Sequence, residues 1–295
     1  MASPKSTQSL PKLAIESKAF DEMAKRYDRG LGGANLQIVQ KLLERCGDEC
    51  PLTAESVVHD NACGPAVVTR AILEFCTTQP SRIYATDYAQ GMIDIASLHQ
   101  QQADWQNVTV ELMNGQNLSF DSNTFTHSIS SLGVFMFPDE EKGLSEMYRT
   151  LKPGGWIGVT SWNDVRWPIA ATAAYERLFP NAAEPMIFPR ARNWEQPEDC
   201  ERMLRVAGFK DIKTEIIQCI NRQPDKEAAI DTLIGFLKNI SPTAREWDDG
   251  VWKQYCDYFH EEAGLLFMPV PSGQGQVEMV MKAVITSGRK PEESA

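Results

Sequence analysis

Short apolar runs alternate with amphipathic segments through the first half of the chain. Five runs rich in β-branched residues predict strands, at 55–60, 82–87, 108–113, 126–132 and 156–162. Three intervening segments repeat apolar residues at helical spacing and predict helices, at 67–76, 91–103 and 141–151. Strands and helices that alternate through short loops are typical of a parallel sheet wound on both faces. The pattern therefore predicts an α/β fold with a doubly wound, mostly parallel sheet.

Both ends of the chain depart from this alternation. Residues 19–45 predict two helices with a glycine-rich break, and residues 1–17 are rich in Ser, Pro and Lys. After residue 162 we expect an aromatic- and proline-rich segment at 163–195, a helix at 197–208 and a strand at 209–220. A mostly helical stretch at 225–263 and a last strand at 277–287 follow. We expect four regions: a disordered tail at 1–17, an N-terminal helical cap at 18–52, the α/β core at 53–162, and insertions with C-terminal strands at 163–295.

Composition narrows the classes of function. The 295 residues are 42% hydrophobic and 23% charged, as in globular proteins, and carry a formal net charge of −11. Such a charge disfavours nucleic acid and anionic membranes as partners. The sequence has no apolar run long enough to span a membrane and no secretory h-region. Seven scattered cysteines favour a reducing compartment, so we expect a cytoplasmic protein. Cys46 and Cys50 lack further ligands at metal-site spacing, so we expect no metal.

The most informative segment is VVHDNACGPAVVT, at residues 57–69. A predicted strand ends in Asp60, and a turn of small residues then opens a helix whose free N–H groups suit a nucleotide-like ligand. The second strand ends in Asp87, an acid placed to accept hydrogen bonds from a ribose diol. The turn lacks both a P-loop and the third Rossmann glycine, so a pyrophosphate is disfavoured. A ribose without a pyrophosphate indicates S-adenosylmethionine (SAM).

Three motifs in this order resemble those of class I SAM-dependent methyltransferases: DNACGPA at 60–66, MNGQNLSF at 113–120 and LKPGGWIGVTSW at 151–162. The resemblance implies a seven-stranded Rossmann-like methyltransferase sheet with helical lid insertions. It also implies that residues 53–162 form the SAM-binding core. Residues 163–295 would then supply the substrate-binding insertions and the strands that complete the sheet.

Other features are similar to those of fungal secondary-metabolite methyltransferases of the gliotoxin bis-thiomethyltransferase kind. These are the DNACG turn, Asn114, the THSIS strand start at 126–130, the pair Trp162 and Trp167, and the closing GQVEMV and ITSGRKP segments. The resemblance implies a small apolar natural-product acceptor. Thiol sulfur is the first expectation for the methylated atom, followed by phenolic oxygen and then nitrogen.

The resemblance also implies cofactor contacts for twelve residues. The amino-acid end of SAM would meet Ser131, Asp60, Asn61, Ala62 and Gly64, and the ribose would meet Asp87. The adenine would meet Tyr88, Met92, Asn114, Gly115 and Gln116, and Tyr27 would cap the cofactor. Some positions depart from the family's pattern. Ala62 and Ala66 replace motif glycines, and Asn114 and His127 each replace an acid.

Methyl transfer to a thiol or phenol needs positioning and water exclusion more than a strong base. None of the four histidines falls in an evident His–acid pair, so we expect proximity catalysis without a metal, with His127 and His260 as weak base candidates. For His127 a hydrogen-bonded core position is the favoured interpretation. Aromatic residues near strand ends and in the insertions are either core or acceptor-binding, and these are Phe135, Phe137, Trp162, Trp167, Phe188, Trp194 and Phe236.

Two other functions stay open at this point. A methyltransferase fold can catalyse a cyclisation or rearrangement without transferring a methyl group, and weak base chemistry in an aromatic pocket suits that as well. A regulatory SAM-binding protein with a protein partner is the second alternative. Asp87 favours cofactor binding in all three cases and does not separate them. For the oligomeric state a monomer is slightly favoured.

Overall fold

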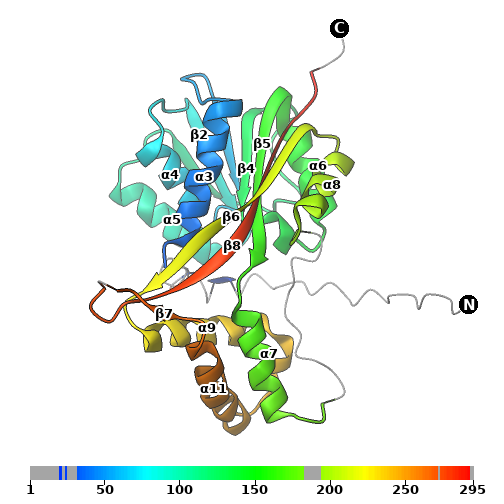
Figure 1. Ribbon diagram of the computed structural model, residues 1–295. Coiled ribbons are helices and arrows are strands. Elements are labelled where there is room, and N and C mark those ends of the chain that lie inside the picture. The colour runs from blue at the N-terminus through cyan, green and yellow to red at the C-terminus, as the bar shows by residue number, and fades with distance from the viewer. Residues whose placement is uncertain (1–19, 22–23, 25–31, 183–193, 272, 293–295) are drawn as a thin grey trace, which may run out of the picture.

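The computed structural model describes residues 20–21, 24, 32–182, 194–271 and 273–292. Five parallel strands and three antiparallel pairings form one mixed sheet (Figure 1). The strands are β1 (Val57–Asn61), β2 (Arg82–Asp87), β3 (Val108–Leu112), β4 (Phe125–Ser131), β5 (Leu151–Asp164), β6 (Lys210–Gln223), the short β7 (Met268–Pro269) and β8 (Val277–Arg289). The main order is β3-β2-β1-β4-β5-β8-β6. The expected seven-stranded, mostly parallel sheet is confirmed, with β7 added at the edge of β8.

Helices cover both faces of the sheet. On one face, α3 (Ala34–Glu49), α4 (Val67–Phe75) and α5 (Gln90–Gln102) pack their apolar sides on β-branched residues of the central strands. On the other face lie α6 (Glu140–Thr150), α8 (Pro197–Val206) and the 3₁₀ turn η1 (Val134–Met136). This double cover buries both faces of the parallel strands, as their almost continuous apolar runs require.

The last strands are longer than their apolar runs predict. β5 begins at Leu151 rather than at residue 156, because the backbone of Gly154 and Gly155 exchanges hydrogen bonds with Lys290. β6 and β8 pair over almost their whole lengths and extend as a ribbon beyond the carboxyl end of the sheet (Figure 1). This ribbon and β5 carry a helical lid.

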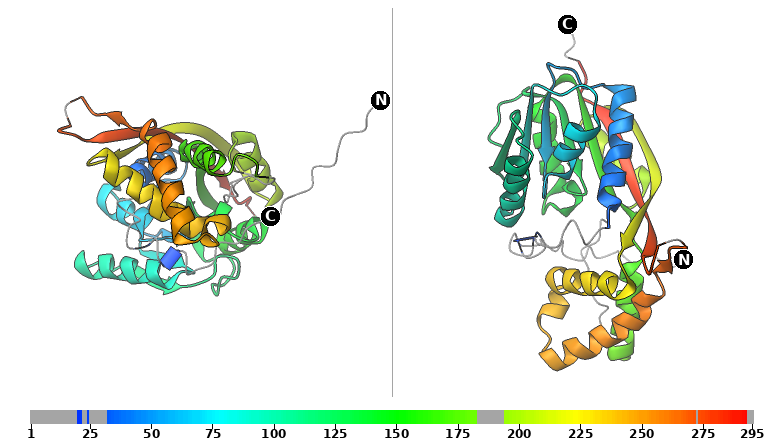
Figure 2. Two further views of the ribbon diagram at one scale, coloured as in Figure 1. Left: turned by 90° about the horizontal axis from the view of Figure 1, so that it is seen from below. Right: turned by 90° about the vertical axis from the view of Figure 1, so that its left-hand side faces the viewer.

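The lid consists of α7 (Trp167–Leu178), α9 (Lys226–Ile240), α10 (Pro242–Arg245) and α11 (Asp249–Gly264). It lies beyond the carboxyl ends of the parallel strands, which the turned views also show (Figure 2). Its interior is aromatic: Tyr255 and Phe259 are fully buried, and the Tyr255 hydroxyl donates to the Ala171 carbonyl at 3.2 Å. The helical insertions predicted after residue 162 are therefore present.

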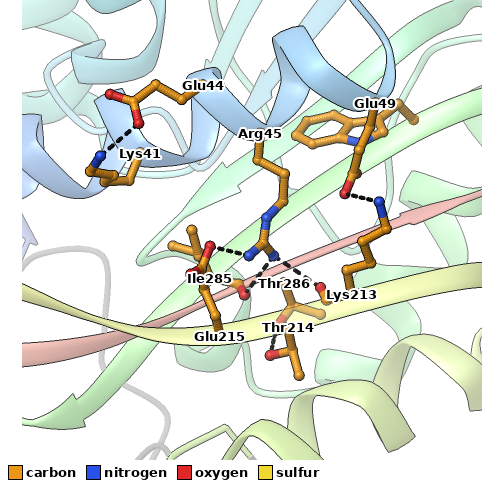
Figure 3. Close-up of polar contacts among 10 residues, drawn as sticks. Lys41, Glu44, Arg45, Glu49, Lys213, Thr214, Glu215, Ile285 and Thr286 are labelled. Atoms are coloured by element: carbon orange, nitrogen blue, oxygen red, sulfur yellow. Dashed lines mark hydrogen bonds and ion pairs between the residues drawn. The ribbon is translucent and has the colours of Figure 1, made fainter.

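Helix α3 is fixed along the ribbon by polar contacts (Figure 3). Arg45 donates to the carbonyls of Lys213 and Ile285 at 3.1 and 3.2 Å and pairs with the Glu215 carboxylate. Nearer its start, the Gln37 amide exchanges two hydrogen bonds with the Ile220 backbone, at 2.9 and 3.0 Å. These contacts fix where the N-terminus of α3 lies, and that end faces the cavity described below.

Candidate active site

A cavity opens at the carboxyl ends of β1, β2 and β4, the position where ligands bind in open α/β sheets. Its empty space is about 1060 Å³, including the open mouth. Ten of the twelve predicted cofactor residues line it, namely Asp60, Ala62, Gly64, Asp87, Tyr88, Met92, Asn114, Gly115, Gln116 and Ser131. Asn61 does not, although its buried amide lies directly beside Gly115. Tyr27 lies outside the described residues.

The turn after β1 keeps the backbone conformation that glycine favours, although Ala62 and Ala66 replace two glycines of the family motif. Ala62, Gly64 and Ala66 have φ values of 58°, 55° and 64°, in the left-handed region. A residue with a Cβ costs about 1–2 kcal/mol in that conformation. The two alanines therefore preserve the shape of the turn at the expense of strain, and the close approach of backbone to ligand remains available.

Asp60 connects β1 to the start of α4. Its Oδ2 accepts hydrogen bonds from the Thr69 N–H at 3.1 Å and the Thr69 hydroxyl at 2.8 Å, whereas Oδ1 has no partner among the described residues. The side chain is fully buried, and this burial raises the pKa of Asp60 to about 7, with a further contribution from the nearby Asp87 charge. A fully buried carboxylate oxygen without a partner favours a cationic or donor group of a ligand.

Asp87 is oriented by the backbone on both sides. Its two carboxylate oxygens accept from the N–H groups of Gly64 and Ala89, each at 2.9 Å. Burial raises the pKa of Asp87, and these N–H groups partly oppose that shift by favouring the charged form. Two oxygens offer about four acceptor positions. Asp87 therefore retains acceptor capacity toward the cavity, as recognition of a ribose diol requires.

The loop after β3, for which adenine contacts were predicted, forms one wall of the cavity. The Asn114 side-chain oxygen accepts from the Gln116 N–H at 2.9 Å, and the Gln116 side chain accepts from the Asp139 N–H at 2.7 Å. Also in the cavity wall, Phe20 contacts the Tyr88 ring edge-on, with centroids 5.8 Å apart. The loop is therefore pre-shaped by its own side chains, and aromatic surface faces it.

Phe137, predicted to contact the acceptor, lines the cavity beside the 114–116 loop. A Cβ at Gly115 would come within 2.5 Å of its ring, and one at Gly143 within 2.3 Å. Two glycines thus make the space that the ring occupies. Sequence reasoning missed its neighbour Met136 and also Phe20, Asn35, Met113, Leu132, Gly133 and Pro138, which all line the cavity.

Among the aromatic residues predicted to contact substrate, Trp167 and Phe236 lie next to the cavity. Their rings pack edge to face with centroids 5.4 Å apart, and both pack against Ile240, as do Phe20 and Met136 of the cavity wall. The position of Trp194 does not support a substrate contact, because it is 1% exposed in the core beside α8. Phe135 and Trp162 pack against the core and are not among the cavity-lining residues. Phe188 lies outside the described residues.

The two histidine candidates lie away from the cavity. His127 is at the amino end of β4, where its ring nitrogens contact the Cys50 carbonyl at 2.9 Å and the Thr126 hydroxyl at 2.8 Å. Burial lowers the pKa of His127, so the neutral core histidine is the better description. His260 is on α11 and lies 3.6 Å from Asp231. Neither position supports a base in methyl transfer.

The titratable side chains among the described residues of the cavity wall are Asp60, Cys63, Asp87 and Tyr88. Cys63 does not suit a nucleophilic role, because burial raises the pKa of its thiol well above the usual range. In the part of the chain that the structure describes, no group of three His, Cys, Asp or Glu side chains forms a candidate metal site. Nor does any described helix combine the length and apolarity needed to cross a bilayer.

Comparisons with known proteins agree with this geometry. Residues 59–159 match the family model described as a methyltransferase domain. The chain is 24% identical over 248 residues to the methyltransferase tpcH of Aspergillus fumigatus, covering 80% of this chain and 85% of the relative. It is 22% identical over 203 residues to the acetylaranotin bis-thiomethyltransferase of Aspergillus terreus, covering 65% and 67%. The solved [4+2]-cyclase SpnF shares the fold, with a TM-score of 0.57, 14% identity and coverage of 96% and 98%.

Fold, cavity and matched domain together define a class I SAM-dependent methyltransferase. Within that class the chain is distantly related to fungal secondary-metabolite methyltransferases, among them a bis-thiomethyltransferase. Its cofactor is SAM, and its methyl acceptor is a small molecule.

Proposed function

We propose that this methyltransferase acts on a small apolar acceptor through a nucleophile that ionises readily, with thiol sulfur as the first candidate and phenolic oxygen as the second. One observation carries the proposal: the described residues of the cavity wall include no His, Lys or Arg, and each of their two carboxylates accepts hydrogen bonds from backbone or hydroxyl donors, with Asp60 Oδ1 as the one carboxylate oxygen without a partner among them. An alcohol would need a strong general base, whereas a thiol or phenol needs much less help.

Within this proposal the cofactor residues act by positioning. Asp87 holds the ribose hydroxyls, Asp60 faces the amino-acid end with its unpartnered oxygen, and the 114–116 loop borders the adenine. Bound SAM supplies an activated methyl group on a sulfonium. The chain then has to align the acceptor in line with that group at about 3 Å and exclude water.

The acceptor side of the proposal lies between η1 and the lid. Met136 lines the cavity and packs against Ile240, against which Trp167 and Phe236 of the lid also pack, so an apolar acceptor that enters there replaces water against rings and a thioether. Methionine adapts its shape to irregular ligands and contacts aromatic rings favourably. This surface suits a ring-bearing molecule, and its relatives in secondary metabolism support such an acceptor class.

The test is a product-mass screen with SAM. Purified protein is incubated with matched aromatic thiols, dithiols and phenols of similar size, and products are analysed by mass spectrometry. We expect thiols to gain about 14 Da, the mass that one methylation adds, at higher kcat/KM than their phenol counterparts. Methylated phenols without any methylated thiol would overturn the choice of sulfur. Conversion without a mass change would indicate rearrangement, and cofactor binding without any turnover would indicate a regulatory role.

A further inference from the structure

A second pocket, the lid pocket, opens at the end of α7, away from the sheet (Figure 1). Its wall comes from the last turn of α7 with the residues that follow it, and from the segment that joins α10 to α11. Among the described residues it shares none with the cavity at the strand ends. The lining residues are Tyr175, Leu178, Phe179, Pro180, Asn181, Ala182, Glu246, Trp247, Asp248 and Val251.

Three aromatic rings form one side of the lid pocket. Tyr175, Phe179 and Trp247 contact one another in pairs, with ring centroids 5.2–6.1 Å apart. The Phe179 ring is tilted by 51° to Tyr175 and by 48° to Trp247, so the three rings do not form a flat stack. The face of an aromatic ring is its negative side and attracts a cation within about 6 Å. The ring arrangement therefore favours a positively charged ligand.

The charged side chains of this wall are both acidic. Glu246 is exposed and has no ion pair among the described residues. Asp248 caps α11 through Oδ1, which accepts from the Gly250 and Val251 N–H groups at 2.8 and 2.9 Å and offsets the positive start of that helix. The last carbonyls of α7 add partial negative charge. Because the described lining residues include no Lys, Arg or His, the pocket is negative overall.

Other half-buried rings of the lid already carry cations of this chain. The Arg177 guanidinium lies over the Tyr258 ring at 4.3 Å, and Lys238 Nζ lies over the Trp252 ring at 5.2 Å. In the part of the chain that the structure describes, no cation lies over Trp247. A cation for the Trp247 ring would therefore come from a ligand.

We propose that the lid pocket binds a small organic ammonium ion whose nitrogen carries alkyl groups. The alkyl groups pack on the rings and on Leu178 and Val251, and the charge lies near the Glu246 and Asp248 carboxylates. A metal ion fits less well, because it needs several oxygen ligands at short distance. Since α7 begins at Trp167, beside the methyl-transfer cavity, and ends at this pocket, a bound ion would stabilise the lid.

Choline and 3,3-dimethyl-1-butanol test the need for charge, because they share one shape and differ only in N⁺ against carbon. The choline nitrogen already carries four carbon groups and accepts no methyl group. Binding to the full chain is followed by NMR through the indole N–H signals of its seven tryptophans, with Trp247→Phe to assign the Trp247 signal. We expect choline to shift that signal and to bind at least about tenfold tighter than the neutral alcohol. Added salt should weaken choline binding.

Four variants locate the ion. Glu246→Gln and Asp248→Asn should each lower choline affinity about two- to fivefold, and both together about tenfold. Asn is as good an N-cap as Asp, so Asp248→Asn preserves the start of α11. Asp249→Asn removes the neighbouring carboxylate outside the wall and is the matched control, with affinity within about twofold of wild type. Phe179→Leu keeps an apolar side chain without a ring, and should weaken choline while sparing the alcohol.

The other outcomes overturn the inference. Failure of choline to bind does so, and so does equal affinity for choline and the alcohol, which would make the pocket simply apolar. A choline shift confined to the Trp167 signal would place the ion in the methyl-transfer cavity instead. Equal losses in Asp249→Asn and Glu246→Gln would indicate general attraction by an acidic surface. The inference does not depend on the methyl acceptor, so none of these results bears on the proposed function.

Discussion

The two ends of the cavity are built by different kinds of interaction. At the cofactor end, backbone N–H groups and a hydroxyl fix two carboxylates, so that Asp60 and Asp87 are directed by hydrogen bonds at 2.8–3.1 Å. At the lid end, the Trp167 and Phe236 rings pack edge to face, and both pack against Ile240, as Met136 of the cavity wall does. Hydrogen bonds to charged groups are directional, whereas apolar burial is not.

This difference indicates which end is specific for one ligand. Directional polar contacts discriminate strongly, because a wrong ligand leaves buried groups unpaired, whereas an apolar wall discriminates weakly between molecules of similar size. We therefore expect the cofactor end to bind a single compound and the lid end to accept a range of related acceptors. The predictions below separate the two ends, because each substitution should affect one and spare the other.

The largest effect is expected at Asp87. Asp87→Ala removes the acceptors for the ribose diol and leaves the Gly64 and Ala89 N–H groups without their present partner. We expect a loss of roughly 2–4 kcal/mol in S-adenosylhomocysteine affinity, measured by calorimetry. Asp94→Ala, on the exposed side of α5, is the control and should bind normally. Unchanged affinity in Asp87→Ala would rule out the ribose placement.

A second prediction concerns the lid alone. Phe236→Ala removes a ring that packs on Trp167 beside the cavity. We expect acceptor kcat/KM to fall by about 10- to 100-fold, the equivalent of roughly 1.5–3 kcal/mol of lost ring burial, while S-adenosylhomocysteine affinity stays within about twofold. Ile169→Ala, at a site on α7 that is 65% exposed, is the control. If Phe236→Ala lowered S-adenosylhomocysteine affinity as much as acceptor kcat/KM, the two ends would not be independent. Phe236→Leu, which preserves apolar volume, should recover most of the activity.

A third prediction uses pH to isolate the amino-acid subsite. Asp60 has its pKa raised to about 7 in the free protein, so below pH 7 it carries a proton that has to leave before an ammonium group can pair with it. S-adenosylhomocysteine affinity should therefore rise about tenfold from pH 6 to pH 8 and then level off. The affinity of 5′-methylthioadenosine, which lacks the ammonium group, serves as reference at each pH. A constant ratio of the two affinities, or the same rise in Asp60→Asn, would exclude Asp60 as the titrating group.

The sequence predicted the cofactor end far better than the lid end. The runs before Asp60 and Asp87 are short, apolar and followed by turn residues, so the strand ends and the edge where their side chains meet follow from local pattern. The departures at Ala62 and Ala66 were visible, but only the backbone shows that both keep a left-handed conformation.

At the lid end the decisive facts are tertiary. Trp194 and Trp167 were both predicted to contact the substrate, yet packing against α8 buries Trp194 in the core, whereas Trp167 packs against Phe236 of α9. Asn35 shows the same limit, since it reads as one more polar position at the start of an amphipathic helix. Its place in the cavity wall depends on how α3 is fixed, which includes the hydrogen bond from Gln37 to Ile220, 183 residues away in sequence. Local patterns contain no information about such a contact.

The smallest expected effect is a gain in stability at the turn between β1 and α4. Ala66 is the N-cap of α4 with φ 64° and ψ 44°, a conformation and a position that glycine favours over alanine. Relief of about 1–2 kcal/mol of strain should outweigh the roughly 0.4–1 kcal/mol of extra freedom that glycine gives the unfolded chain. Ala66→Gly should thus raise the unfolding temperature by about 1–3 °C, measured by calorimetry, without changing acceptor preference. Ala71→Gly, in the interior of the same helix, should lower it instead. A destabilised Ala66→Gly would mean that packing of the Ala66 methyl group contributes more than the backbone strain costs.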